Sequence, residues 1–458
     1  MIERYCRPKM NALWEAKSRY AVWLKVELLV CEALAEEGTI PAVAYQTIRS
    51  KAKIKIGRID ALEKVVKHDV IAFLSSITEQ VGESGRYLHW GMTSSDLVDT
   101  SLAVLLQKAS DILIEDITAL MNVLKEQALR HKETVMMGRS HGMHGEPITF
   151  GLKMALWHEE MRRNLTRMIC AREEISFGKI SGSMGTYAHL SPEIEAFVMK
   201  KLSLSPEPIA NQIVQRDRHA HYLQTLALIA ASLEKFATEI RHLQRTEVME
   251  AEEPFTVGQK GSSSMPHKRN PIGCENICGL SRVIRSHAMT ALENVTLWHE
   301  RDISHSGPER IILPDSALLL DFMLDRFTKI MADLAVYPKK MIKNMEKSGG
   351  IVFSQKVLLL LIEKKVKREE AYGVIQEIAS TVLEKEGSFK KETLSNPFVL
   401  SKLTKEEILS CFDPKGYLKA VDTIYKNIFV ATATPRMTTR AGRGKIATSA
   451  ISMRSALE

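Results

Sequence analysis

The sequence predicts an all-α protein with a long central helical bundle. Residues 97–137 and 209–253 contain no glycine or proline, the two residues that most disfavour a helix interior. Both stretches are far longer than the mean helix of about 11–12 residues. Their apolar side chains recur at alternating steps of three and four, the spacing of one helix face. The two apolar rows are Leu113, Ile117, Leu120 and Leu124, and Leu223, Leu226, Ala230, Leu233, Ala237 and Ile240. Long apolar faces need long partners, so we expect the bundle to be shared between subunits.

The composition is typical of a globular chain with a large core. Its 458 residues are 45% hydrophobic and 26% charged, enough for two or three domains. Part of the formal net charge of +8 comes from the end of the chain, where only Glu458 opposes Arg436, Arg440, Arg443, Lys445 and Arg454. The remainder is mildly basic, which suits an anionic small molecule at least as well as nucleic acid. No basic stripe interleaved with aromatic residues is present, so we expect no nucleic-acid partner.

Cysteine usage and the absence of targeting signals indicate a cytoplasmic protein. The cysteines, at positions 6, 31, 170, 274, 278 and 411, are scattered, and a chain this long needs no disulfides. Cys274 and Cys278 lie one helical turn apart, but no matching Cys or His pair exists, so we interpret them as core residues. Residues 1–5 are charged and unlike a signal peptide. No apolar run is long enough to span a bilayer, so we expect no membrane partner.

We divide the chain into four regions. Residues 1–96 form an N-terminal helical domain, and residues 97–364 form the central bundle, with further helices over 151–177 and about 314–336. Residues 365–429, of mixed charge, form a C-terminal helical cap. Residues 430–458 are rich in Ala, Thr, Ser and Arg with little apolar periodicity, so we expect a disordered basic tail.

Two early motifs suit an anionic ligand. Lys67-His68-Asp69 is expected on a helix within residues 65–77, where the lysine and histidine donate to phosphate or the histidine is structural. Residues 89–96, HWGMTSSD, precede the first long helix, with one of the last three as its N-cap. Thr93 and Ser94 then lie beside the positive end of that helix. Capping alone would also explain these two hydroxyls.

Residues 136–147 contain three glycines and a proline, which predicts a loop. This loop carries His141 and His144. A histidine titrates near neutral pH and is a natural general acid or base. No acidic residue or third histidine stands at ligand spacing, so the pattern does not favour a metal site.

Residues 261–271, GSSSMPHKRNP, predict a mobile cationic loop that leads into a helix. Gly261 bends freely, Pro266 prevents regular helix, and Lys268 and Arg269 add positive charge. Asn270 and Pro271 have the form of an N-cap and first helical residue. The helix is expected to continue towards residue 298. Serine, lysine and an N-cap grouped so tightly favour an anion-binding loop over an ordinary surface loop.

Residues 299–310 carry Arg301, Ser306 and Arg310, a set that can grip a phosphate at two points. Together these motifs resemble one superfamily. The loop GSSSMPHKRNP is similar to the signature loop of the fumarase/aspartase superfamily, which releases fumarate. Its MPHKRNP ending, HWGMTSSD and WHERDISHS are similar to the adenylosuccinate lyase family. Gly307-Pro308 departs from the serine and small residue expected there.

The resemblance implies a three-domain fumarase/aspartase-like fold with its long-helix bundle shared in a homotetramer. It implies β-elimination of fumarate from adenylosuccinate, giving AMP, and from SAICAR, giving AICAR, in purine biosynthesis, without a metal or other cofactor. Ser262 would be the catalytic base and His141 the catalytic acid. The implied substrate-binding residues are Arg4, Tyr5, Lys67, His68, Asp69, His89, Thr93, Ser94, Gln212, Ser263, Lys268, Arg269, Asn270, Asn276, Arg301, Ser306 and Arg310.

Three alternatives remain open on the sequence. One is another fumarate-releasing lyase or a carboxymuconate-type cycloisomerase of the same superfamily, against which HWGMTSSD and WHERDISHS argue. Another is a non-catalytic structural homologue, which would not need Ser262, His141 and Lys268 together. The third is a nucleic-acid binder, indicated only by charge.

Overall fold

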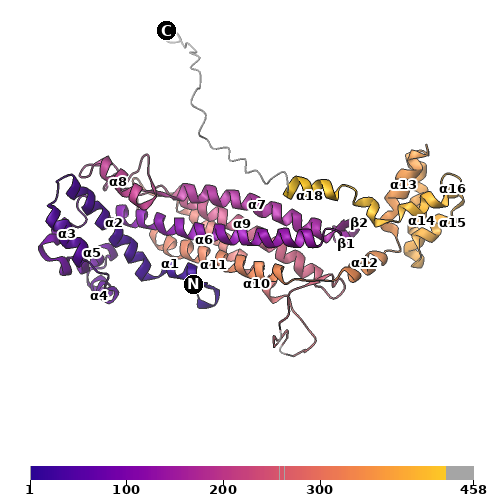
Figure 1. Cartoon of the computed structure of the whole chain (residues 1–458), viewed down its shortest axis with the longest axis horizontal. Helices are drawn as coiled ribbons and strands as arrows, with labels where there is room; N and C mark the ends of the chain where they lie inside the picture. Colours follow the sequence, from indigo (N-terminus) through magenta and orange to yellow (C-terminus); the bar gives the residue numbers. More distant parts are fainter. Residues whose placement is uncertain (1, 257, 263, 430–458) are drawn as a thin grey trace, which may run out of the picture.

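The computed structural model describes residues 2–256, 258–262 and 264–429. The predicted tail, residues 430–458, and Ser263 lie outside these ranges. The molecule is elongated, with a long bundle between a helical domain at each end (Figure 1). No helix of the described part is both long and apolar enough to cross a membrane.

Five long helices make the bundle. They are α6 (Ser94–Arg130), α7 (Phe150–Ile175), α9 (Arg216–Leu243), α10 (Ile272–Glu293) and α11 (Ser306–Ala332). Both predicted apolar rows, on α6 and α9, are fully buried in one continuous core, which confirms the helix-face interpretation. Cys274 and Cys278 lie in this core, as predicted. At 37 residues, α6 is about 55 Å long, so it carries side chains to both ends of the bundle.

The N-terminal end contains η1 (Glu3–Tyr5), α1 (Pro8–Trp14), α2 (Ala16–Glu36), α3 (Ala42–Lys51), α4 (Ile56–Val66), α5 (Asp69–Val81) and η2 (Gly82–Tyr87). In its core Tyr20 stacks on Phe73, and Trp23 packs edge-on against both rings. This core also takes in the start of α6 and the later helix α8 (Pro192–Leu202), which packs on α2.

The other end is built from short helices. They are α12 (Pro338–Glu346), η3 (Ile351–Phe353), α13 (Ser354–Glu363), α14 (Arg368–Lys385), α15 (Phe389–Ser395), α16 (Pro397–Leu400), α17 (Lys405–Cys411), η4 (Pro414–Tyr417) and α18 (Val421–Phe429). The helices α13 to α17 share a core of their own. The last helix returns to the bundle, where Tyr425 donates to the Ala128 carbonyl at 2.7 Å.

The predicted loop over residues 136–147 is wrong, because this segment forms a β-hairpin. Strand β1 (Val135–Ser140) pairs antiparallel with β2 (Met143–Thr149). The two turn residues, His141 and Gly142, both have positive φ, 53° and 78°, the backbone twist that suits a tight hairpin. A side chain at Gly138 would lie 2.7 Å from the Glu146 carbonyl. The glycines and the proline of this segment therefore serve strand pairing and the turn.

The remaining strands are two residues each. In the described part, β3 (Phe177–Gly178) pairs with β4 (Ser205–Pro206), and β5 (Ala251–Glu252) pairs with β6 (Ala335–Val336). These short pairings fasten connecting segments to the bundle. They leave the predicted all-α class unchanged.

Several predicted helix ends are wrong by a few residues. Lys67 and His68 stand at the junction of α4 and α5, where Lys67 is left-handed. Thr93, one residue earlier than predicted, is the N-cap of α6. Asn270 does not cap α10, which begins at Ile272 after Pro271, and its side-chain amide instead donates to the Gly261 carbonyl at 3.1 Å.

Other helices also differ in extent from the predicted runs. Helix α6 ends at Arg130, before residue 137, and α9 spans Arg216–Leu243 rather than residues 209–253. Helix α10 ends at Glu293, before residue 298. Helix α11 begins at Ser306 and continues through Pro314, because the packed bundle outweighs the local preference of proline.

Candidate active site

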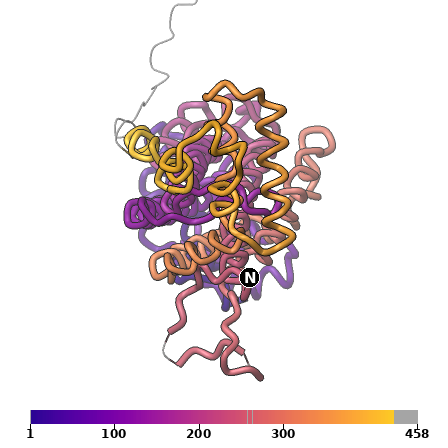
Figure 2. Tube along the Cα trace, turned by 90° about the vertical axis from the view of Figure 1, so that its right-hand side faces the viewer, coloured from indigo at the N-terminus to yellow at the C-terminus, as the bar shows by residue number. Residues whose placement is uncertain are grey.

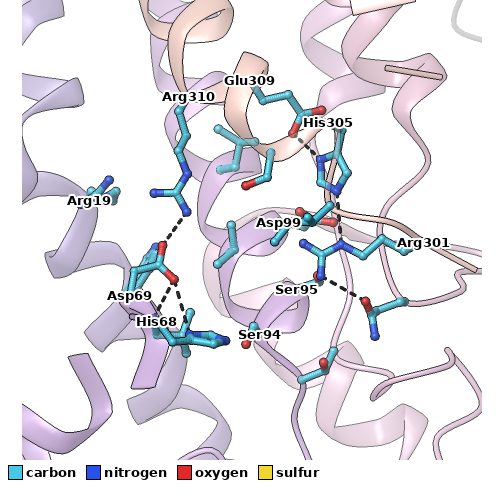
Figure 3. A pocket seen from close by; sticks show the side chains of 18 of the residues that line it. Arg19, His68, Asp69, Ser94, Ser95, Asp99, Arg301, His305, Glu309 and Arg310 are labelled. Carbon is cyan, nitrogen blue, oxygen red and sulfur yellow. Dashed lines mark hydrogen bonds and ion pairs between the residues drawn. The ribbon is translucent and has the colours of Figure 1, made fainter. Parts of the chain in front are cut away.

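A cavity of about 470 Å³ lies where the N-terminal domain meets the bundle. Side chains from α1, α2, the α4–α5 junction, the start of α6, the segment before α9 and the start of α11 line it. The cavity gathers nine of the predicted binding residues: Lys67, His68, Asp69, Thr93, Ser94, Gln212, Arg301, Ser306 and Arg310. Figure 3 shows several of these side chains directed into one space.

The N-termini of α6 and α11 open into this cavity. Ser94 and Ser306 are the first residues of α6 and α11, and both line the cavity. The unpaired N–H groups and the dipole of a helix favour an anion at such ends. Pro308 stands in the first turn of α11, where a missing N–H costs nothing, so the departure at Gly307-Pro308 is compatible with the helix.

The start of α6 is held by a buried ion pair. Asp96 accepts from the Thr93 N–H at 2.8 Å and from the backbone of Ser181 and Gly182 at 3.2 Å each. The Lys179 ammonium pairs with the same carboxylate, and both side chains are fully buried. This pair fixes the segment after α7 against the cavity wall.

Arg310 and Asp69 face each other across the cavity from α11 and α5 (Figure 3). The Arg310 guanidinium donates to Asp69 Oδ2 at 2.5 Å. Burial alone would raise the pKa of Asp69, but the bonded Arg310 guanidinium holds it below its usual value. His68 Nδ1 caps α5 by accepting from the Ile71 N–H at 3.4 Å. The charge of Arg310 is therefore already shared with a carboxylate.

Arg216 forms a second buried charge cluster in the cavity wall. Its guanidinium bonds both oxygens of Asp99, at 2.8 and 2.9 Å, and its Nε lies 3.0 Å from Glu309. Burial would raise the pKa of Asp99, but Arg216 outweighs it and lowers this pKa to about 2. Burial, followed by the charge of Arg216, lowers the pKa of His219 to about 4, so this histidine is neutral at pH 7.

Sequence reasoning missed several residues of the cavity. Asp99, Arg216 and Glu309 carry the buried cluster, and Arg19 lines the wall while stacking on Tyr20 at 4.8 Å. Asp99 and Arg216 stand near the polar starts of α6 and α9, where charged residues are common, so the sequence offered no signal that set them apart. Nothing local indicated that they would pair.

His141 lies away from this cavity, exposed at the turn of the β-hairpin. The neighbouring Arg139 forms a two-point ion pair with the buried Glu250, at 2.6 and 2.9 Å, and Asn344 donates to Glu250 at 2.8 Å. Burial and then Arg139 lower the pKa of His144. The hairpin is thus anchored to the bundle and to α12 while its histidine turn faces outward.

The segment before α10 projects from the bundle in both Figure 1 and Figure 2. Ser262 Oγ accepts from the N–H groups of Ser264 and Met265, at 3.3 and 3.1 Å. Lys268 is exposed, and Arg269 packs over Phe255 at 4.8 Å. Gly261 has no room for a side chain, because a Cβ would lie 2.1 Å from the Lys268 carbonyl. Close packing of the loop, rather than free bending, therefore requires this glycine.

The remaining predicted binding residues lie outside both the cavity and the projecting loop. Tyr5 packs edge-on against Phe322 of α11, and Arg4 beside it is exposed. Asn276 accepts from Arg326 at 3.2 Å. His89 Nδ1 lies 2.7 Å from the buried carboxylate of Glu27. Burial opposes protonation of His89, but Glu27 outweighs it and raises its pKa.

Within one chain, the predicted catalytic residues therefore lie apart from the cavity that contains most of the predicted binding residues. The β1–β2 hairpin lies at the end of the bundle opposite α5, which carries part of the cavity wall (Figure 1). None of His141, Ser262, Lys268 or Arg4 lines the cavity. Within the described part of the chain, no group of three or more His, Cys, Asp or Glu side chains could hold a metal ion.

Comparison with known proteins identifies the family. Residues 4–286 match the family described as Lyase, and residues 350–428 match the family described as Adenylosuccinate lyase C-terminus. The chain is 52% identical to the adenylosuccinate lyase of Bacillus subtilis (strain 168), over 94% of this chain and all of that protein. It is also 52% identical to the adenylosuccinate lyase of Aquifex aeolicus (strain VF5), over 94% of this chain and 99% of that one.

Solved structures of lower identity share the fold. A fumarate lyase from Mesorhizobium sp. BNC1 aligns with a TM-score of 0.86 and 25% identity over 93% of this chain and 99% of that one. A 3-carboxy-cis,cis-muconate lactonizing enzyme from Pseudomonas putida aligns with a TM-score of 0.85 and 26% identity over 93% and 96%. The two adenylosuccinate lyases match at about twice the sequence identity of these solved structures. The chain belongs to the adenylosuccinate lyase family.

Proposed function

We propose that the protein eliminates fumarate from adenylosuccinate, giving AMP, and from SAICAR, giving AICAR. The observation that carries this proposal is the cavity itself. It combines the N-termini of α6 and α11 with Arg301, which has no carboxylate partner among the described residues. Such a cavity suits a phosphorylated substrate. The relatives that match 94% of the chain carry the name of this activity.

The reaction needs a base near the carbon that loses a proton and an acid near the departing nitrogen. A base removes the proton from the carbon next to a succinyl carboxylate, and the electron pair moves into that carboxylate. The pair then forms the carbon–carbon double bond as the carbon–nitrogen bond breaks, and an acid protonates the nitrogen. Cationic and N–H donors around the carboxylate stabilise the intermediate.

We assign the base to Ser262. Two backbone N–H groups are directed at its Oγ, and donors of this kind stabilise the deprotonated oxygen. Lys268 and Asn270 follow in the same loop and would stabilise the carboxylate charge, with Arg269 and Ser263 as further contacts. Closure of the loop over the substrate would exclude water.

We assign the acid to His141, which is exposed at the hairpin turn. The phosphate would bind Arg301, Ser306 and Arg310, with Lys67, His68, Asp69, Thr93, Ser94 and Gln212 around it. Arg4, Tyr5, His89 and Asn276 complete the proposed contacts. An anion at Arg310 would compete with its bond to Asp69.

Because one chain separates these groups, we propose that each site is completed by other copies in a homotetramer. The projecting loop of one copy and the hairpin of another would reach the cavity of a third. The small-molecule substrates are then the only ligands required, without a cofactor, and purine synthesis would place the enzyme in the cytoplasm.

The test is an absorbance assay on the full-length protein. Adenylosuccinate should disappear while fumarate and AMP appear in equal amounts, and SAICAR should behave likewise. Replacing Ser262 or His141 by alanine should lower turnover by about 100-fold or more. Failure to release fumarate from either substrate, or cyclisation of a carboxymuconate instead, would overturn the proposal.

A further inference from the structure

Arg301 is held in the cavity by an imidazole and a side-chain amide. Its Nε–H donates to His305 Nε2 at 3.3 Å, and its Nη1 donates to Gln212 Oε1 at 3.1 Å (Figure 3). In the part of the chain that the structure describes, no carboxylate lies within ion-pair distance of this guanidinium. Its positive charge is therefore available to a bound anion.

His305 connects Arg301 to a carboxylate one helical turn away. The ring is 3% exposed, and its Nδ1 lies 3.1 Å from Glu309 Oε2. Since Nε2 accepts from Arg301, the proton of a neutral ring is on Nδ1, where it donates to Glu309. Arg216 Nη2 lies 3.3 Å from the same Nδ1, and with the proton on Nδ1 this is a packing contact without a hydrogen bond. The imidazole is thus oriented at both nitrogens.

Glu309 is itself fixed by Arg216, which Asp99 holds at two points. The two carboxylates offset the charge of Arg216, so this guanidinium has little left for a ligand. Arg216 and Arg301 therefore differ in role although they line the same cavity. Arg216 stabilises the wall, whereas Arg301 keeps its charge for the cavity.

We propose that His305 and Glu309 are positioning residues that aim Arg301 at the phosphate of the substrate. With Nε and one hydrogen of Nη1 engaged, the edge formed by Nη1 and Nη2 remains free to donate at two points. A phosphate monoester accepts such a pair well. This inference rests on the proposed function, and it adds that the geometry of phosphate recognition is set from behind by a buried imidazole–carboxylate pair.

The test compares a phosphorylated substrate with its nucleoside. In His305→Leu, kcat/KM for adenylosuccinate should fall by about 10- to 100-fold, mainly through KM, because Arg301 loses its acceptor. For succinyladenosine, which has no phosphate, the change should be less than about threefold. His305→Gln should restore most of the preference for phosphate, since its amide can accept from Arg301 and donate to Glu309. His305→Asn, whose amide is too short to span both, should lower it.

The matched control is His221→Leu. His221 pairs with Glu174 on the partly exposed face of α9 and does not line the cavity. His221→Leu should leave kcat/KM unchanged for both substrates. An equal loss for both substrates in His305→Leu, or an unchanged preference in both His305→Leu and His305→Asn, would overturn the inference.

Calorimetry separates this inference from the proposed function. AMP and adenosine are titrated into the same variants, so no turnover is needed. Weaker AMP binding in His305→Leu with unchanged adenosine binding would support the positioning role even if no fumarate were released. Unchanged binding of both ligands would overturn it, even in an active enzyme.

Discussion

Asp99 on α6 and Arg216 at the first position of α9 form a two-point ion pair, with both side chains about 2% exposed. Removing Asp99 leaves Arg216 buried with only Glu309 to offset its charge. Asp99→Asn should therefore lower the free energy of unfolding by about 3–5 kcal/mol, measured by chemical denaturation at fixed protein concentration. Asp111→Asn, which breaks the partly exposed pair with Arg172, should cost less than about 1 kcal/mol. Equal effects would contradict the structural role of the buried pair.

The same pair predicts acid sensitivity. The folded pKa of Asp99 is about 2, against an ordinary value of 3.8. A depressed pKa contributes stability that is present above the ordinary value and is lost as pH falls through the folded value. The melting temperature of the native protein should fall between about pH 4 and pH 2, and Asp99→Asn should show a shallower fall. A parallel pH profile in the variant would count against the assignment.

Asp321 on α11 predicts a slope of opposite sign. It is fully buried beside Arg7, Asp116 and Asp325. Burial first and then Asp116 raise its pKa to about 8, against the lowering by Arg7. A raised pKa contributes stability below the ordinary value that is lost as pH rises.

In the native protein, ionisation of Asp321 should lower the free energy of unfolding by at most about 1.4 kcal/mol per pH unit between about pH 4 and pH 8. Asp321→Asn should abolish this pH dependence. Its melting temperature should therefore exceed that of the native protein more at pH 8 than at pH 5. Glu115→Gln, an exposed carboxylate on α6, should keep the native slope. A constant difference across this range would contradict the raised pKa.

Gly261 predicts loss of activity without loss of the fold. A Cβ there would lie 2.1 Å from the Lys268 carbonyl, so Gly261→Ala must shift the loop that carries Ser262. Misplacement by about 1 Å can lower turnover by about 100-fold, while the melting temperature should change little because the loop is outside the core. Gly57→Ala, in α4 with open space around it, should keep full activity and gain up to about 1 kcal/mol in stability.

Sites shared between copies predict complementation. His141→Ala and Ser262→Ala should each be inactive alone. Unfolded, mixed in equal amounts and refolded together, they should recover activity in about one quarter of the sites if the two residues come from different copies. Mixing Ser262→Ala with the double variant should recover none. Absence of recovery in hybrids of confirmed size would place both residues in one chain.

Local pattern foretold much of this protein. Helix periodicity acts over three or four residues, so the buried rows of α6 and α9 could be identified from spacing alone. The residues around His68, Ser94 and Arg301 could be predicted as binding residues because each group of polar and charged side chains lies within one short segment. The limits of local pattern appear at the hairpin, where glycines that predicted a loop serve strand pairing, and at Pro314, which packing retains inside a helix.

Tertiary structure decided which charges are free. Asp99, Arg216 and Glu309 lie on three different helices, and their pairing neutralises one guanidinium while Arg301, a few residues from Glu309, keeps its charge. The separation of His141 from the cavity was decided in the same way, by the length and direction of the bundle helices. Ion pairing and distance depend on contacts between segments far apart in the chain, and the chemistry of any one segment does not specify them.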